Sequence, residues 1–326
     1  MASDRMIILR MNNSKKMEIL TLSMFNISYS ENLKDTDFWL EKRKIVKYLE
    51  NRHLSDGGYF FAQVEPSSGL DTYLAVKTLN LLGEEIKHTK SIVSFWESKE
   101  KTLDNLFGIF LAVETYKELG LLSEVSRKYK AYLLNYSKKN NTFPRITSII
   151  FNKGFKLNNL SFAMNYISSI GKELEDLYYF AVLCRDLKIK IDKKRVINFV
   201  LSLNNEDGGF GQNNNSNLMT THHALSILNI FSYKIATTEE TYNYLMSQWE
   251  KCDYLEDVFY ITESIILLKK PFTIAEKIFN FVSSCQRKDG GFSRCCVMGI
   301  QTIEDTYYAV KILKTCEKYS HKVLLK

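Results

Sequence analysis

Apolar residues recur at helical spacing in three segments that align with one another without a gap. Residues 195–210 read RVINFVLSLNNEDGGF, residues 277–292 read KIFNFVSSCQRKDGGF, and residues 44–60 read KIVKYLENRHLSDGGYF. The apolar spacing predicts a helix in each segment. Each helix is followed by Asp-Gly-Gly-aromatic, and a glycine after a helix allows the left-handed turn in which the chain reverses.

A second helix is predicted after each of these turns. Residues 71–79 (DTYLAVKTL) and 305–313 (DTYYAVKIL) share the pattern D-T-Y-x-A-V-K-x-L, and residues 220–228 (TTHHALSIL) follow a related one. Asp or Thr is a good N-cap, so we expect these helices to begin at Asp71, Asp305 and Thr220. Weaker copies of the helix start occur at residues 103–107, 175–179 and 256–260.

Two helices in a unit of about 40 residues are typical of an open solenoid or a closed ring. The chain has room for about six such hairpins. The second helix of each unit is richer in small and aromatic residues, so it should be the inner one. In a ring, the acidic helix starts at Asp71, Asp176, Asp257 and Asp305 would gather at one mouth of a central cavity. We predict an all-α fold, with an N-terminal extension (1–38) before the helical domain (39–326).

Composition and charge narrow the functional classes. Hydrophobic residues make up 45% and charged residues 25%, which is typical of a globular protein, and only three prolines favour long helices. The net charge of +7 is typical of a lysine-rich surface, and it would also be expected if the protein had a pocket for an anion such as a diphosphate. We find no nucleic-acid-binding motif and no membrane-spanning stretch. Six cysteines without C-x-x-C, and no signal peptide, indicate a reducing compartment and a cytoplasmic location.

The turns at residues 286–292 (QRKDGGF) and 206–211 (EDGGFG) resemble the repeats of protein prenyltransferase β subunits and the QW-type repeats of terpene cyclases such as squalene–hopene cyclase. The resemblance extends from about Lys44 to Cys316. It implies an (α/α)6 toroid whose central cavity is lined with aromatic residues and holds an isoprenoid chain. It also implies a small isoprenoid ligand and a separate helical α-type subunit as a partner.

Protein prenyltransferases bind zinc through Asp, Cys and His, with the Asp and Cys in a D-x-C-Y motif on an inner helix. Here Asp257 matches, but Phe259 replaces the cysteine and Tyr308 replaces the histidine. Because zinc needs about four donors, we expect no metal cofactor unless the site is rebuilt. A rebuilt site would draw on residues near the same mouth, which are Cys252, Cys295, Cys296, His222 and His223.

The resemblance also implies a diphosphate clamp. Lys251 lies at the position of the family's Arg, Tyr260 matches its Tyr, and Arg294 would supply another positive charge. Mg²⁺ would be expected only together with the diphosphate. Further candidates for substrate binding lie at the starts of inner helices, and they are Tyr307, Tyr308, His222 and His223. Without a zinc-bound thiolate, Asp257 or a histidine would activate the prenyl acceptor as a base.

A second motif match points to another chemistry. Residues 302–307 (TIEDTY) are similar to the D-x-D-D-T-A motif of class II terpene cyclases, in which the middle Asp protonates an alkene. Glu304 takes the position of that acid and Asp305 that of its neighbour, whereas Thr302 and Tyr307 depart from the motif. Three functions therefore stay open: a transferase that binds a prenyl diphosphate, a cyclase that uses Glu304 and Asp305, and a non-catalytic binding protein.

Overall fold

The computed structural model describes residues 35–100, 103, 105–139 and 170–323. Its contacts divide the chain into two compact units, Met1–Leu40 and Glu41–Lys326. The second unit is described here. Apart from two small hairpins, the regular structure of its described residues is helical. None of the helices in the described part is both long enough and apolar enough to cross a membrane.

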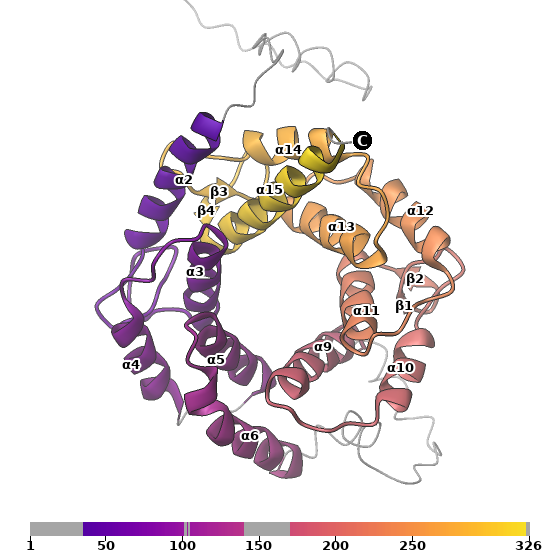
Figure 1. Ribbon diagram of the computed structural model, residues 1–326, viewed down its shortest axis with the longest axis horizontal. Coiled ribbons are helices and arrows are strands. Elements are labelled where there is room, and N and C mark those ends of the chain that lie inside the picture. Colours follow the sequence, from indigo (N-terminus) through magenta and orange to yellow (C-terminus); the bar gives the residue numbers. More distant parts are fainter. Residues whose placement is uncertain (1–34, 101–102, 104, 140–169, 324–326) are drawn as a thin grey trace, which may run out of the picture. The chain divides into compact units, whose positions relative to one another are not determined.

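Six helical hairpins, the first of them from Glu41 onward, form the second unit, each with an outer and an inner helix (Figure 1). The outer helices are α2 (Asp35–Glu50), α4 (Thr89–Lys99), α6 (Leu122–Lys139), α10 (Lys193–Leu201), α12 (Thr238–Trp249) and α14 (Ala275–Ser284). The inner helices are α3 (Gly69–Leu81), α5 (Leu106–Glu118), α9 (Ile170–Asp186), α11 (Leu218–Ile230), α13 (Leu255–Leu268) and α15 (Ile303–Val323). Each inner helix contacts the next one, and α15 contacts α3. The inner ring is therefore closed, and the predicted (α/α)6 toroid is confirmed.

Burial separates the two kinds of helix in the way that the sequence pattern predicts. The outer helix α14 is amphipathic and buries Ile278 and Val282 along one stripe. The inner helix α13 buries residues on nearly every side, among them Leu255, Val258 and Ile261. A helix that is apolar all round is covered by neighbours on most sides. The apolar inner helices thus form the core of the ring.

The three Asp-Gly-Gly turns share one structure. The first glycine of each has a positive φ, with values of +93° at Gly57, +84° at Gly208 and +96° at Gly290, as the motif predicts. A Cβ on these glycines would overlap the backbone of a neighbouring outer helix: α4 for Gly57, α12 for Gly208 and α2 for Gly290. Because the last turn packs on α2, it joins the final hairpin to the first.

A threonine in the inner helix ties each turn to its own hairpin. The hydroxyl groups of Thr72, Thr221 and Thr306 accept hydrogen bonds from the backbone N–H groups that follow the glycine pairs, at 2.9, 3.0 and 3.1 Å. After two of the turns the chain forms a small antiparallel hairpin before the inner helix begins. These hairpins are β1 (Gly211–Gln212) with β2 (Asn215–Ser216), and β3 (Phe292–Ser293) with β4 (Gln301–Thr302).

The predicted helix starts at Asp71, Thr220 and Asp305 are wrong by three residues. The backbone N–H of Asp71 donates to the side chain of the true N-cap Ser68, at 3.2 Å. In the same way, the backbone N–H groups of Thr220 and Asp305 donate to the side chains of the N-caps Asn217 and Thr302, at 2.8 and 2.9 Å. Asp71 and Asp305 therefore lie inside the first turn of their helices, where a negative charge still interacts favourably with the helix dipole.

The weak copy at residues 103–107 is also out of register. The side chain of Asn105 caps α5 by accepting from the N–H of Gly108, at 2.7 Å. Gly108 is therefore the equivalent of Asp71, whereas Asp104 lies outside the described residues. The sequence comparison missed this because α5 has neither an acidic residue nor a tyrosine at the aligned positions.

Candidate functional site in the inner ring

Equivalent positions of the inner helices form three levels of the ring wall. We call the first level the rim; it contains the acidic residues of the first helical turns. The second level follows two residues later, and we call it the aromatic belt. Its members are Tyr73, Phe110, Tyr178, His222, Phe259 and Tyr307, with their neighbours Tyr179, His223, Tyr260 and Tyr308. One turn further, about 6 Å along each helix, lies the polar level, made of Lys77, Glu114, Val182, Ser226, Glu263 and Lys311.

The aromatic belt begins with contacts between α3, α5, α9 and α11. The ring centroids of Tyr73 and Phe110 lie 5.9 Å apart, and those of Phe110 and Tyr179 lie 4.5 Å apart. Tyr178 stacks on His223 at 4.7 Å with an angle of 13° between the planes. The side chains of four successive inner helices therefore touch one another along the wall.

The belt continues from α11 back to α3. His222 contacts the ring of Tyr260 at 5.4 Å, and Phe259 lies 4.6 Å from the ring of Tyr308. The ammonium group of Lys77 in α3 lies 5.2 Å from the ring centroid of Tyr307 in α15. All six inner helices contribute to the belt, and Lys77 of the polar level connects its two ends at α15 and α3.

The two histidines of the belt are neutral and leave ring nitrogens unpaired. His222 is 8% exposed and His223 is 6% exposed. Burial lowers the pKa of His222 to about 3, helped by His223, Lys311 and Lys77, and burial lowers the pKa of His223 to about 4. Among the described residues, the Nδ1 atoms of both rings are buried without a hydrogen-bond partner. Each ring can therefore offer one hydrogen bond to a ligand.

Carboxyl groups at the rim are held by hydroxyl donors. The Tyr308 hydroxyl donates to Glu304 at 3.0 Å, and the Thr302 hydroxyl donates to Asp305 at 2.7 Å. Burial raises the pKa of Glu304, and the charge of Asp305 adds to this effect. Burial likewise raises the pKa of Asp305, partly offset by the Thr302 hydrogen bond. Both groups are therefore easier to protonate than an exposed carboxyl group.

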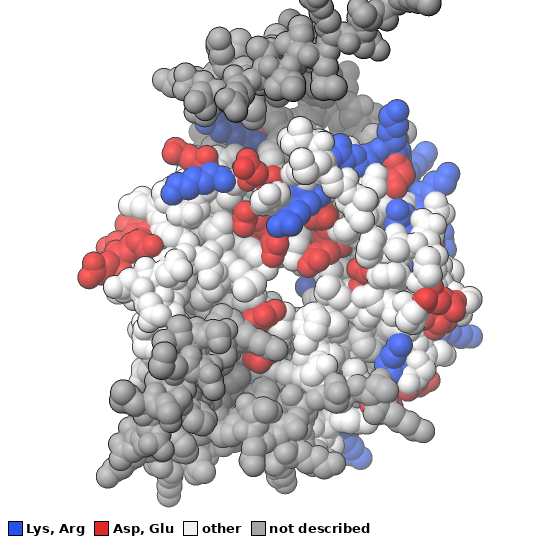
Figure 2. Space-filling view, turned by 180° about the vertical axis from the view of Figure 1, so that it is seen from behind, with Lys and Arg blue, Asp and Glu red and all other residues white. Residues whose placement is uncertain are grey.

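Further rim carboxyl groups come from α3 and α13. Burial raises the pKa of Asp71 to about 6, and the nearby charge of Glu304 raises it further. Burial also raises the pKa of Asp257, while the positive charge of Arg294 opposes that shift. The guanidinium of Arg294 lies 4.2 Å above the ring of Tyr254. Figure 2 shows acidic side chains gathered around the opening at the centre of the ring.

The prenyltransferase alpha-alpha toroid domain model matches residues 10–139 and 165–321 of the chain. The chain belongs to this family. No curated protein matches the sequence closely enough to be reported beside it. Membership in the prenyltransferase toroid family agrees with the closed ring of hairpins.

The structure of this prenyltransferase toroid brings together most of the residues singled out in the sequence. Glu304, Asp305, Asp257 and Arg294 lie at the rim; His222, His223, Tyr260, Tyr307 and Tyr308 lie in the belt. Lys251 is exposed in the turn between α12 and α13.

Sequence reasoning did not select Phe110 or the polar level. Lys77 and Lys311 occupy the lysine of the repeated motif D-T-Y-x-A-V-K-x-L, four residues after Tyr73 and Tyr307. Residues four apart lie on the same face of a helix, so this spacing was a usable signal. Phe110 had no such signal, because the register of α5 was misaligned.

The donors near the rim do not fit zinc. Within the described ranges, no three His, Cys, Asp or Glu side chains are grouped so that they could hold a metal ion. Cys295 is buried and its thiol donates to the carbonyl oxygen of Met298 at 3.2 Å, whereas Cys296 is exposed. The rebuilt zinc site considered from the sequence has no counterpart in this part of the chain, and no step below uses a metal.

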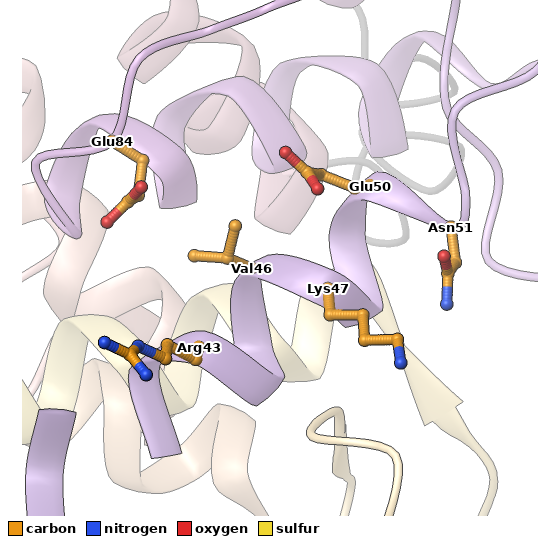
Figure 3. Close-up of a pocket in the computed structure, with 6 residues that line it drawn as sticks. All are labelled: Arg43, Val46, Lys47, Glu50, Asn51 and Glu84. Carbon is orange, nitrogen blue, oxygen red and sulfur yellow. The ribbon is translucent and has the colours of Figure 1, made fainter. Parts of the chain in front are cut away.

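A separate pocket lies on the outside of the ring, along α2 (Figure 3). Its lining residues are Arg43, Val46, Lys47, Glu50, Asn51 and Glu84. Both of its carboxyl groups are already paired with lysines, Glu50 with Lys87 at 2.5 Å and Glu84 with Lys42 at 2.7 Å. This pocket contains none of the residues of the rim, the belt or the polar level.

Proposed function

We propose that this prenyltransferase toroid is an isoprenoid-handling enzyme that holds the chain of a prenyl diphosphate inside its ring. The observation that carries the proposal is the aromatic belt, to which every inner helix contributes. An isoprenoid chain gains free energy when its apolar surface is buried against such a wall. The faces of the aromatic rings also attract a positive charge that develops on an allylic carbon.

The proposed reaction is a transfer of the prenyl group. The bond between C1 and the diphosphate oxygen breaks, and the electron pair leaves with the diphosphate. A lone pair of the acceptor forms the new bond to C1, and Asp257 takes the proton that the acceptor loses. The raised pKa of Asp257 makes this carboxylate a stronger base than an exposed one. The acceptor, and a helical partner subunit if one is required, would approach from the rim.

Blocking the ring tests where the chain binds. Ser226 in α11 is half-buried on the polar level, with its hydroxyl 3.4 Å from Nε2 of His222. We expect Ser226→Trp to obstruct the interior of the ring at the polar level and to weaken binding of farnesyl and geranylgeranyl diphosphate at least tenfold in calorimetric titrations. The matched control is Ser284→Trp, because Ser284 is exposed on the outer helix α14. This control should bind both ligands as the unchanged protein does.

Equal binding by the two tryptophan variants would place the ligand outside the ring and refute the proposal. Failure of the unchanged protein to bind either diphosphate, or any neutral isoprenoid, would instead favour a toroid without an isoprenoid ligand. Thermal unfolding of both variants, measured beside the titrations, shows whether the ring is intact.

A cyclase is the second candidate, and the geometry of Glu304 favours it. This carboxyl group has a raised pKa, accepts a hydrogen bond from Tyr308 and lies at the entrance to the belt. We propose as the alternative that protonated Glu304 gives its proton to a terminal alkene, whose cation the belt then surrounds. If this reaction occurs, the protein should turn over a neutral polyprenyl substrate. Glu304→Gln should abolish that turnover, and Glu256→Gln should retain it. Turnover that survives Glu304→Gln would contradict it.

A further inference from the structure

Three inner helices carry the same pair of side chains near their starts, a glutamate followed four residues later by a tyrosine. The pairs are Glu175 with Tyr179 in α9, Glu256 with Tyr260 in α13, and Glu304 with Tyr308 in α15. The hydroxyl of Tyr179 donates to Glu175 at 2.6 Å, and the hydroxyl of Tyr308 donates to Glu304 at 3.0 Å. Residues four apart lie on one face of a helix. Each glutamate therefore lies on the rim side of a tyrosine of the belt.

The three glutamates gather around Tyr260. Burial raises the pKa of the Tyr260 hydroxyl, and the charges of Glu256, Glu304 and Glu175 raise it further. Burial also raises the pKa of Glu256, the charge of Glu304 adds to that shift, and Arg294 opposes it only in part. Among the described residues, none of the three glutamates forms an ion pair. This part of the rim therefore carries more negative charge than its neighbours neutralise.

Helix α11 carries a different pair at the same positions, with Met219 in place of the glutamate and His223 in place of the tyrosine. The ring centroid of His223 lies 4.7 Å from that of Tyr178, 6.2 Å from that of Tyr260 and 6.5 Å from that of Tyr179. The imidazole is 6% exposed, and its Nδ1 is buried without a hydrogen-bond partner in the described part of the chain. A buried polar atom without a partner costs free energy, which a ligand with a complementary group would recover.

Carboxylates, aromatic rings and a neutral imidazole together suit an organic cation. Carboxylates accept charge-assisted hydrogen bonds from an ammonium group, and the faces of aromatic rings attract its positive charge. A neutral imidazole has one nitrogen that accepts an N–H. Figure 2 shows acidic side chains around the opening of the ring, where a ligand can reach them. A metal ion fits less well, because no three His, Cys, Asp or Glu side chains in the described ranges are grouped to hold one.

We infer that the rim binds an organic ammonium group at Glu256 and Tyr260, with Glu304 on one side and Glu175 and His223 on the other. For the transfer reaction of the proposed function, on which this role rests, the acceptor then carries an ammonium group. An ammonium nitrogen has no lone pair, so a different atom of the acceptor attacks C1. The neutral substrate of a cyclase has no such group and makes no use of Glu256.

The bound cation also affects the diphosphate. The prenyl chain lies along the belt, and C1 with its diphosphate lies toward the rim, where the acceptor enters. The rim carboxylates repel the diphosphate, and a positive charge bound among them reduces that repulsion. The acceptor and the prenyl diphosphate should therefore strengthen each other's binding.

The test compares hexylammonium with the neutral 1-hexanol in calorimetric titrations of the full chain at neutral pH. We expect the unchanged protein to prefer hexylammonium at least tenfold, since hydrogen bonds to charged groups contribute on that scale. Glu256→Gln combined with Glu304→Gln should remove the preference and leave the affinity for hexanol unchanged. Glu256→Asp combined with Glu304→Asp should retain it, because the charges stay. The matched control is Glu240→Gln combined with Glu276→Gln, which removes two exposed carboxylates from the outer helices α12 and α14.

Three results would overturn the inference. The first is equal affinity of the unchanged protein for hexylammonium and hexanol. The second is a preference that survives the two rim substitutions to glutamine, or that the outer-helix control loses to the same extent, because overall charge would then explain it. The third is displacement of hexylammonium by an equal concentration of Mg²⁺, which would assign the carboxylates to a metal ion. Thermal unfolding of each variant shows whether its ring is intact.

Titrations with geranylgeranyl diphosphate separate this inference from the proposed function. Saturating hexylammonium should tighten its binding at least fivefold in the unchanged protein, and this coupling should disappear in the variant with both rim glutamines. Weaker binding of the diphosphate in the presence of hexylammonium would mean that the two compete for one place, and the role of the cation in the acceptor would be wrong. Binding of hexylammonium without any binding of the diphosphate would contradict the proposed function and leave the cation site.

Discussion

At the three Asp-Gly-Gly turns the same residues make the same contacts in every copy, whereas equivalent positions on the inner wall carry different side chains. Each turn has a glycine with positive φ and a threonine that accepts a backbone N–H. On the polar level the corresponding positions hold Lys, Glu, Val, Ser, Glu and Lys. Repetition in the turns builds the hairpins and closes the ring. Variation on the wall makes one side of the ring chemically different from another.

This contrast predicts that a turn is far less tolerant of change than other glycine positions. Gly208 has a φ of +84°, and a Cβ there would overlap the backbone at Glu240 and Thr241. We expect Gly208→Ala to lower the free energy of unfolding by about 3 kcal/mol or more, because strain and overlap add. The control is Gly120→Ala, since Gly120 has a similar φ of +74° and open space around it.

The control should lose only about 1 kcal/mol, which is the cost of the left-handed conformation alone. Urea unfolding of the two variants measures the difference. Equal losses would mean that the contact between the turn and α12 contributes nothing, and the account of the turns would be wrong.

Removing a turn threonine should have the next largest effect. The Thr306 hydroxyl accepts the N–H of Phe292 at 3.1 Å and donates to the carbonyl of Thr302 at 2.7 Å. Thr306→Val leaves the buried N–H of Phe292 without an acceptor, so we expect a loss of about 1–3 kcal/mol in urea unfolding. Thr262→Val is the matched control, because the buried Thr262 hydroxyl has no partner in the described part of the chain. A comparable loss in the control would refute this explanation.

The third prediction concerns the rim and depends on pH. Burial raises the pKa of Asp71 from 3.8 to about 6 in the folded protein. A carboxyl group with a raised folded pKa favours folding most when it is protonated, and this contribution is lost as pH rises through the folded pKa. Relative to Asp71→Asn, the unchanged protein should therefore lose stability between about pH 4 and 6 and then change little. A difference between the two that stays constant from pH 4 to 7 would contradict the burial of this carboxyl group.

The sequence allowed the hairpin repeat, the inner position of the second helices and the acidic rim to be predicted. These features depend on local signals, such as glycine turns and residues spaced along one helix. The N-cap positions were wrong because Ser68, Asn217 and Thr302 precede the residue that stands out in the repeat. The register of α5 was wrong because its aligned positions lack the acidic and tyrosine markers.

The contacts of the belt and of Lys77 could not be predicted in the same way. They join side chains from α3 and α15, which are far apart in sequence and meet only when the ring closes. Both lysines of the repeated motif look alike in the sequence. Only the packing shows that Lys311 has Glu263 as a partner and that Lys77 lies between tyrosine rings instead.

The central claim is that an isoprenoid chain lies against the aromatic belt. The most direct measurement is photocrosslinking with a prenyl diphosphate that carries a diazirine in its chain, followed by mass spectrometry of the labelled peptides. The account predicts labels on the inner helices α9, α11, α13 and α15 near the belt, and competition by unlabelled geranylgeranyl diphosphate. Labels confined to outer helices, or labelling that the unlabelled ligand does not reduce, would contradict it.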